Sequence, residues 1–274
     1  MNPRLRLPVG ILGALALAAI AAPLIAPFDP AAQPDPIGLA LQAPGGVHLF
    51  GTDPYSRDVL SRVLYGARTS LGIAALAVSV ALSLGVLVGA LAALGSRWSD
   101  AVLMRATDSA LAIPRLLLLL LIVAGTGPLT PAALALVLGA TGWMTTARLV
   151  RQETKRLLAT EYVRAADALG IPPVRLWRAH ILPGLLPTLT VAATIAFATA
   201  VPLEAALSFL GLGVRPPDAS WGNIILEAEG RIRSAWWLVL FPTLAIVTAT
   251  LSANLLAERL AEGANAVGPN AERA

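Results

Sequence analysis

Cysteine is absent from this 274-residue sequence, and histidine occurs only twice, as His48 and His180. Without a thiol the chain can form no disulfide, no thiolate metal site and no cysteine nucleophile. The two histidines fall in distant polar segments, where they cannot share a metal ion or serve as the base of an intramembrane hydrolase. The sequence therefore predicts no metal site, no cofactor and no catalytic residue.

Lysine occurs once, as Lys155, and no Gly-x-x-x-x-Gly-Lys-Ser/Thr motif is present. Because that motif holds the phosphates of a nucleotide, the chain is not expected to bind or hydrolyse ATP. Only 13% of the residues are charged and 57% are apolar, whereas soluble domains carry about 25% charged residues. The net charge is +4, and the arginines cluster between apolar runs. This pattern favours a membrane protein over a nucleic-acid-binding one.

Six apolar runs are long enough to cross a bilayer as helices. They cover residues 7–28, 71–94, 109–125, 131–147, 185–212 and 235–256. The first could be a signal peptide, but its length favours an uncleaved span. Arg115 lies in the first turns of the third run, where it can reach the membrane interface. The sequence thus predicts an all-α polytopic membrane protein with six transmembrane helices.

The intervals between the runs carry further signals. Residues 29–44 are rich in proline and predict an extended loop, while residues 56–62 predict an amphipathic interfacial helix. Residues 95–108 predict a short polar turn, and residues 211–234 a polar segment. Inside the second run, Gly85 and Gly89 offer either a groove for a neighbouring helix or a lipid-facing surface.

A polar interval at residues 161–187, here called the knuckle, separates the fourth and fifth runs. Helical spacing predicts one short helix over 161–169 and a second over 174–181. Gly170 and the pair Pro172-Pro173 break the two helices apart. One face is apolar (Tyr162, Ala165, Ala166, Leu169, Val174, Trp177, Ile181) and the other carries Arg164, Arg175 and Arg178. This shape suits docking on another protein, although it could be an ordinary basic loop.

The knuckle resembles the cytoplasmic EAA motif of ABC importer permeases, through Ala165-Ala166, Gly170 and Leu182-Pro183. Two further stretches resemble the dipeptide, oligopeptide and nickel branch of that family, and in particular its C-type subunit. They are Gly51-Thr52-Asp53 with Arg57 to Arg62, and Glu204 to Val214 with Pro216-Pro217 and Ser220-Trp221-Gly222. The sequence departs from the family pattern at Ser56 (usually glycine), Arg164 (usually glutamate), His180 (usually isoleucine) and residues 257–260.

The resemblance implies a type I permease fold, with a binding protein that delivers a small peptide, a related solute or nickel. It also implies a homologous second permease and two ATP-binding subunits as partners. The chain itself would contact membrane lipid in a bacterial inner membrane. The expected domains are residues 1–69 (first span, outer loop and interfacial helix), 70–260 (permease core, with a docking loop at 148–184) and 261–274 (cytoplasmic tail). The expected ATPase-docking residues are Tyr162, Arg164, Ala165, Ala166, Leu169, Gly170 and Trp177.

Six spans place both termini on one side of the membrane. With the N-terminus inside, fourteen of the 20 basic residues lie on the cytoplasmic side, and the knuckle is cytoplasmic. Glu204 is the one acid inside an apolar run, and it predicts either a pathway or helix-interface residue or a proton-coupling group. A proton-driven secondary transporter is therefore the alternative function. A membrane-embedded enzyme is a third hypothesis, but the sequence contains no set of catalytic residues to support it.

Overall fold

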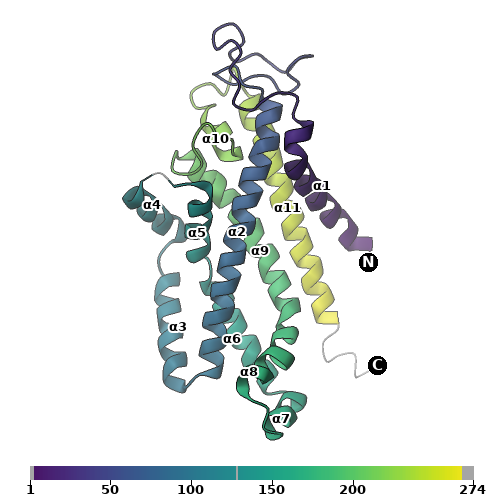
Figure 1. The fold of residues 1–274 in the computed structure, drawn as a ribbon, viewed down its shortest axis with the longest axis vertical. Coiled ribbons are helices and arrows are strands. Elements are labelled where there is room, and N and C mark those ends of the chain that lie inside the picture. Colours follow the sequence, from purple (N-terminus) through teal and green to yellow (C-terminus); the bar gives the residue numbers. More distant parts are fainter. Residues whose placement is uncertain (1–2, 128, 267–274) are drawn as a thin grey trace.

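The computed structural model describes residues 3–127 and 129–266, and within these ranges the chain is helical and contains no strand. The predicted all-α fold class is confirmed. The long helices run along one axis of an elongated molecule (Figure 1). The elements in chain order are α1 (Pro3–Ile25), α2 (Val59–Leu94), α3 (Arg97–Leu111), α4 (Arg115–Thr126), α5 (Pro131–Ala140), α6 (Met144–Leu158), α7 (Glu161–Ala168), α8 (Pro173–Leu176), η1 (Trp177–Ile181), α9 (Leu182–Phe209), α10 (Trp221–Leu226) and α11 (Trp237–Ala266).

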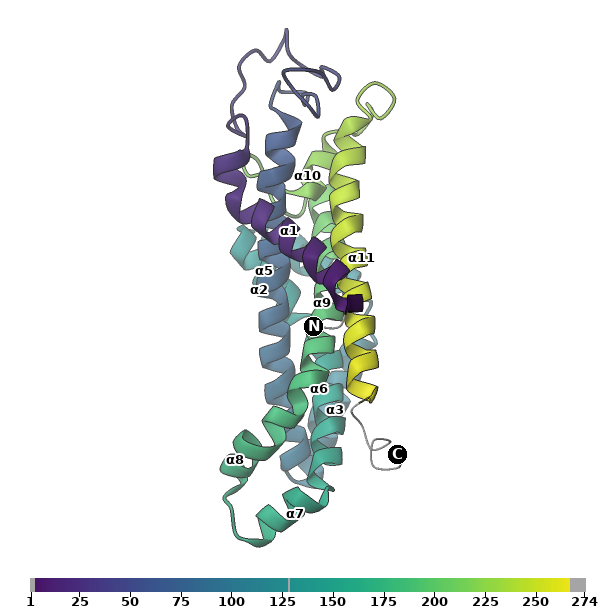
Figure 2. The same ribbon diagram turned by 90° about the vertical axis from the view of Figure 1, so that its right-hand side faces the viewer.

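Helix α2 is the central element of the fold. It contacts α1, α5, α6 and α9, while α11 packs along α9. Helix α1 crosses over α2 and α11 at an angle (Figure 2). With 36 residues, α2 is about 54 Å long, whereas a bilayer core is only about 30 Å thick. Part of α2 must therefore extend beyond the hydrocarbon region.

The start of α2 corrects one expectation. The Asp58 side chain accepts the backbone N–H of Ser61 at 2.8 Å, which caps the helix, and the helix then continues unbroken to Leu94. The separate interfacial helix predicted at residues 56–62 is therefore wrong. Val59 and Arg62 form the first turn of the long helix and are buried within the protein.

The two glycines in α2 line a close helix contact. A Cβ at Gly85 would lie 2.5 Å from the Cβ of Thr146, and a Cβ at Gly89 would lie 2.5 Å from the carbonyl oxygen of Ala147. Both neighbours belong to α6. Of the two predicted readings, the groove for a neighbouring helix is therefore confirmed.

Four helical stretches are long and apolar enough to cross a membrane unaided, namely Leu5–Ile25, Val59–Leu94, Pro173–Phe209 and Trp237–Gly263. Two helix pairs are bent, α3 with α4 by 83° and α5 with α6 by 47°. Counting each bent pair as one crossing gives the six predicted spans. The fifth span is longer than predicted, because α8, η1 and α9 form one continuous helical stretch despite Pro183 and Pro187.

The polar turn predicted at residues 95–108 is also wrong. It is largely α3, which begins after Ser96, whose Oγ accepts the backbone N–H of Ser99 at 3.2 Å. No glycine or proline follows until Pro114, so nothing in the sequence ends the helix earlier. As a result, Arg115 opens α4 at the bend, where its Nη2 donates to the carbonyl oxygen of Leu138 at 2.7 Å.

The two ends of the molecule differ. At one end, α7 and the turn that joins it to α8 project beyond the other helices, and this is here called the knuckle end (Figures 1 and 2). The opposite end carries residues 26–58 and α10, and is here called the loop end. The first residues of α1 and the last described residues of α11 both point away from the loop end (Figure 1).

Candidate functional site

The turn of the knuckle forms as the sequence predicts. Helix α7 ends at Ala168, and Gly170 follows with φ +75°, a left-handed conformation that costs L-residues with a side chain about 1–2 kcal/mol. Pro173 then occupies the first turn of α8, where its missing N–H would have had no intrahelical partner. Nothing lies within 4 Å of a Cβ placed at Gly170, so the backbone conformation, not space, requires glycine here.

The knuckle has a small core of its own. Val163, Ala166 and Leu176 are buried together, with Leu158 and Ile171 packed against them. This core joins α7 to α8 and to the end of α6. The predicted apolar face is therefore divided, because Ala166 points into the knuckle instead of outward.

The remaining predicted docking residues lie outside this core. Tyr162, Arg164, Ala165, Leu169 and Gly170 are exposed. Leu169 is 83% exposed and Val174, on α8, is 71% exposed. Trp177 is half-buried in η1 and packs against a cluster that includes Leu157 and Ile181. Five of the seven predicted residues thus present a surface, while Ala166 and Trp177 pack inward.

The charges at the knuckle end fall into two groups. Residues of α6 are paired with α3: Arg151 and Lys155 both donate to Asp100, at 2.7 and 2.5 Å. By contrast, Arg164, Arg175 and Arg178 are exposed and form no ion pair within the described residues. The knuckle therefore carries three unpaired positive charges at this end, in addition to the exposed Arg97 at the start of α3.

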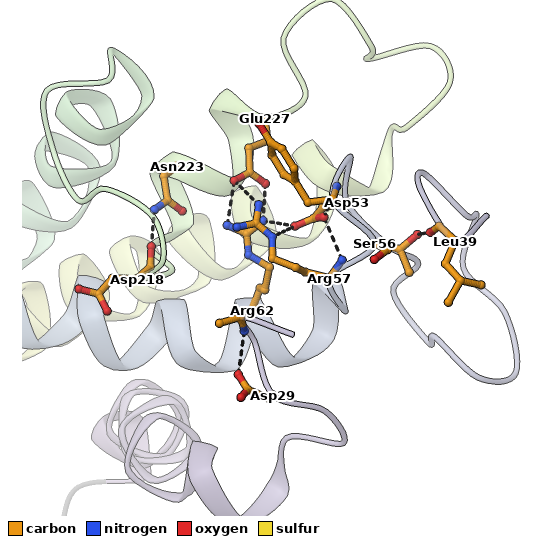
Figure 3. Close-up of polar contacts among 12 residues, drawn as sticks. Asp29, Leu39, Asp53, Ser56, Arg57, Arg62, Asp218, Asn223 and Glu227 are labelled. Atoms are coloured by element: carbon orange, nitrogen blue, oxygen red, sulfur yellow. Dashed lines mark hydrogen bonds and ion pairs between the residues drawn. The ribbon is translucent and has the colours of Figure 1, made fainter. Parts of the chain in front are cut away.

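At the loop end, four charged side chains meet in a buried network, here called the charge cluster: Asp53, Arg57, Arg62 and Glu227 (Figure 3). Arg57 Nε donates to Asp53 Oδ2 at 2.6 Å, and its Nη2 donates to Glu227 Oε1 at 2.7 Å. Arg62 pairs with Asp53 and donates to Glu227 Oε1 at 3.0 Å. Asp53 and Arg62 are fully buried, and Glu227 keeps 12% of its side chain exposed.

The charge cluster joins two segments that are far apart in the sequence. Asp53 and Arg57 belong to the loop that precedes α2, Arg62 lies in the first turn of α2, and Glu227 follows α10. The backbone N–H groups of Tyr55 and Arg57 also donate to Asp53 Oδ1, at 2.7 and 3.0 Å. Two positive and two negative charges balance, so no uncompensated charge is buried. Asp53, Arg57 and Arg62 belong to a sequence pattern that resembles the permease family, whereas no local signal in the sequence points to Glu227.

The loop is held to the helices by further contacts near the charge cluster. His48 Nδ1 and Asp58 Oδ1 lie 2.9 Å apart, and the indole N–H of Trp237 donates to the carbonyl oxygen of Thr52 at 3.0 Å. Ser56, where the resembled family usually has glycine, has φ +62°. That value explains the glycine of the family pattern, since only glycine adopts it without cost.

Glu204 is fully buried in α9 among neighbouring helices. The hydroxyl of Ser208 donates to its Oε1 at 2.7 Å, while its Oε2 has no hydrogen-bond partner among the described residues. The described residues contain no cluster of three acid, histidine or cysteine side chains that could hold a metal ion. Glu204 lies at the interface of α9 with α2 and α10, close to Ser70 and Ser220.

Comparison with known proteins identifies the chain. The sequence profile of the family described as binding-protein-dependent transport system inner membrane component matches residues 85–265, which is more than half of the sequence. The chain belongs to this family.

Relatives agree with this assignment. The permease is 39% identical over 255 residues to a putative peptide transport system permease protein of Brucella suis, covering 93% of the permease and 85% of the relative. It is also 39% identical over 220 residues to the dipeptide transport system permease protein DppC of Alkalihalophilus pseudofirmus, covering 80% and 72% of the two chains.

A solved structure shows the same fold. The methionine ABC transporter MetNI, in inward-facing conformations, contains a chain that matches 75% of the permease with a TM-score of 0.61 and 21% identity. The match covers 97% of that chain. The permease therefore has the type I ABC importer permease fold. The relatives named above support neither the proton-coupled alternative nor transport of nickel.

Proposed function

We propose that the permease imports small peptides as one of two homologous membrane subunits, powered by two ATP-binding subunits that dock on the knuckle. The relatives named for peptide and dipeptide transport support the substrate class. The observation that carries the docking role is the projecting knuckle, which leaves large apolar side chains and unpaired arginines exposed. Exposed apolar groups rimmed by charge mark protein interfaces.

The orientation follows from this assignment. The knuckle, both termini and the proposed ATP-binding subunits lie in the cytoplasm, and the loop end faces the binding protein on the outer side. Arg115 sits at a helix bend, but counting it on neither side leaves the excess of basic residues on the knuckle side unchanged. The bacterial inner membrane then surrounds the apolar part of the bundle.

The knuckle is built to transmit motion into the bundle. Its core packs against Leu158 at the end of α6, and α8 continues through η1 into α9. Helix α6 in turn packs tightly on α2 at Gly85 and Gly89. A displacement of the knuckle by an ATP-binding subunit would therefore move α6 and α9 against α2, and would alter the path between them.

Leu169 is the sharpest test of docking, because its side chain is 83% exposed and supports no internal packing. Burying a leucine at an interface contributes about 1.5–3 kcal/mol, so Leu169→Ser should weaken binding of the ATP-binding subunits about 10- to 150-fold. The measurement is recovery of these subunits with the tagged permease, together with peptide uptake. Both should fall while membrane insertion is unchanged.

Leu49→Ser is the matched control, since Leu49 is 60% exposed at the opposite end. It should leave recovery of the ATP-binding subunits unchanged. Normal recovery with Leu169→Ser, or an equal loss with Leu49→Ser, would contradict docking on the knuckle. Uptake of labelled peptide by the intact complex, compared with uptake of Ni²⁺, tests the substrate class.

A further inference from the structure

A cavity of about 790 Å³ opens at the loop end of the permease. It is walled by Gln33 and by residues of segments 54–57, 208–216 and 223–231, and is here called the mouth cavity. Ligand pockets for small molecules measure about 300–1,000 Å³, so the mouth cavity is large enough for a short peptide. The proposed docking of the ATP-binding subunits does not involve the mouth cavity.

The floor of the mouth cavity is the charge cluster. Arg57 and Glu227 both line it, and they are bonded to the buried side chains of Asp53 and Arg62 (Figure 3). Asn223, also in the wall, is fixed because its side-chain amide donates to the backbone oxygens of Asp218 and Val214 at 2.8 and 3.3 Å. These side chains cannot turn away without breaking buried hydrogen bonds. The floor is therefore a preformed polar surface.

The rim of the mouth cavity carries charges of both signs. Arg215, Glu229 and Arg231 line it, and all three are exposed. Within residues 3–127 and 129–266, none of the three takes part in an ion pair. Two cationic groups and one anionic group thus surround the same opening with their charges uncompensated.

We infer that the mouth cavity is a binding site for the two charged ends of a short peptide. Its carboxylate would be bound by the rim arginines and its ammonium group by Glu229, above the polar floor made by Arg57 and Glu227. This inference rests on the proposed peptide transport and names the place where the permease first holds its substrate.

The shape of the site favours a small ligand over a protein partner. A protein docking surface typically covers about 800 Å² on each side, whereas the mouth cavity is concave and has buried polar groups at its base. A zwitterionic peptide matches the opposed charges of the rim. The alternative, contact with a protruding segment of the binding protein, is decided by the experiment below.

The absence of cysteine allows a direct test. Gln33→Cys places a single thiol in the cavity wall, and Ala43→Cys places one on the same loop outside it. Each variant is purified with its partner subunits, reconstituted in nanodiscs, and labelled with a fluorescent maleimide. The additions are trialanine with free termini, the same peptide acetylated and amidated, or the binding protein alone. Leu226→Cys, in another part of the wall, is a second reporter.

Trialanine with free termini should slow labelling of Gln33→Cys about fivefold, which corresponds to occupation of about four cavities in five. The capped peptide should leave the rate unchanged, and Ala43→Cys should respond to neither. Unslowed labelling at both wall positions in a complex that transports peptide would overturn the inference while leaving the transport function intact. So would equal protection by the capped peptide, or protection by the binding protein alone.

Arg231→Gln tests the carboxylate contact, with Arg233→Gln as its control, because Arg233 is exposed nearby but does not line the cavity. Loss of a partly exposed ion pair should raise the protecting concentration of trialanine about fivefold. Because the amidated peptide has no carboxylate, its effect on the labelling rate should be the same for Arg231→Gln and for the unmodified permease. An equal effect of the two substitutions would contradict direct binding by Arg231.

Discussion

Arg62 offers the strongest test of how the loop end is held together. Its guanidinium is fully buried and pairs with both Asp53 and Glu227. Arg62→Ala would leave two buried carboxylates facing the single arginine Arg57, so the cluster would change from neutral to a net charge of −1. Removing one partner of a buried ion pair typically costs about 3–5 kcal/mol. The same loss is expected here.

The assay is unfolding of the purified permease in mixed micelles with increasing SDS, followed by tryptophan fluorescence. Glu227→Gln is combined with Arg62→Ala, because the double variant restores a neutral cluster of Asp53 and Arg57. The double variant should be less destabilised than the sum of the two single variants, by about 1–3 kcal/mol. Arg233→Ala, at an exposed position of the same end, should stay within about 0.5 kcal/mol of the unmodified permease.

Two results would refute this reasoning. A loss below about 1 kcal/mol for Arg62→Ala would place the pair in the range of exposed surface ion pairs. Additive effects in the double variant would show that Arg62 and Glu227 do not stabilise each other. In either case the charge cluster could not be the element that secures residues 26–58 to α2 and α10.

Three further predictions concern the knuckle, the helix groove and the topology. Gly170→Val should reduce recovery of the ATP-binding subunits and peptide uptake together, because φ +75° costs a β-branched residue more than about 1–2 kcal/mol. Gly170→Asn should retain most of both, and equal recovery for the two variants would count against the backbone argument. Gly89→Leu should destabilise the permease by about 1–3 kcal/mol in the SDS assay, because its Cβ would lie 2.5 Å from the carbonyl oxygen of Ala147 and would push α6 from α2. An unchanged midpoint of SDS unfolding would mean that the contact between the two helices is loose. A reporter fused after Arg156 should be active in the cytoplasm and one within residues 29–44 outside, and an external Arg156 fusion would remove the docking proposal.

The sequence alone predicted the spans and the knuckle, because their signals are local. An apolar run of about 20 residues is stable across a bilayer whatever its neighbours do. Gly170 and Pro172-Pro173 restrict the backbone at their own positions, so the turn between α7 and α8 could be predicted from those residues. The helix capped by Ser96 cannot be told from a turn by its polar composition, although no glycine or proline within it interrupts a helix.

Which side chains face outward on the knuckle was decided by packing. The spacing of Tyr162, Ala165, Ala166 and Leu169 allows a common face, but the small core formed with Leu176 turns Ala166 inward and leaves Leu169 exposed. Leu176 belongs to the next helix, so the spacing within one helix could not show which residues it would cover.

The entry of Glu227 into the charge cluster and the formation of the mouth cavity depend on the tertiary structure. Arg57 and Glu227 are 170 positions apart, and nothing near either residue in the sequence identifies the other as its partner. Burying such charges is favourable only when opposite charges and hydrogen-bond donors surround them, and this condition is met only after α2, α10 and the loop have come together. Local composition therefore determined that the chain crosses the membrane and where it turns, whereas long-range packing decided where its buried charges meet.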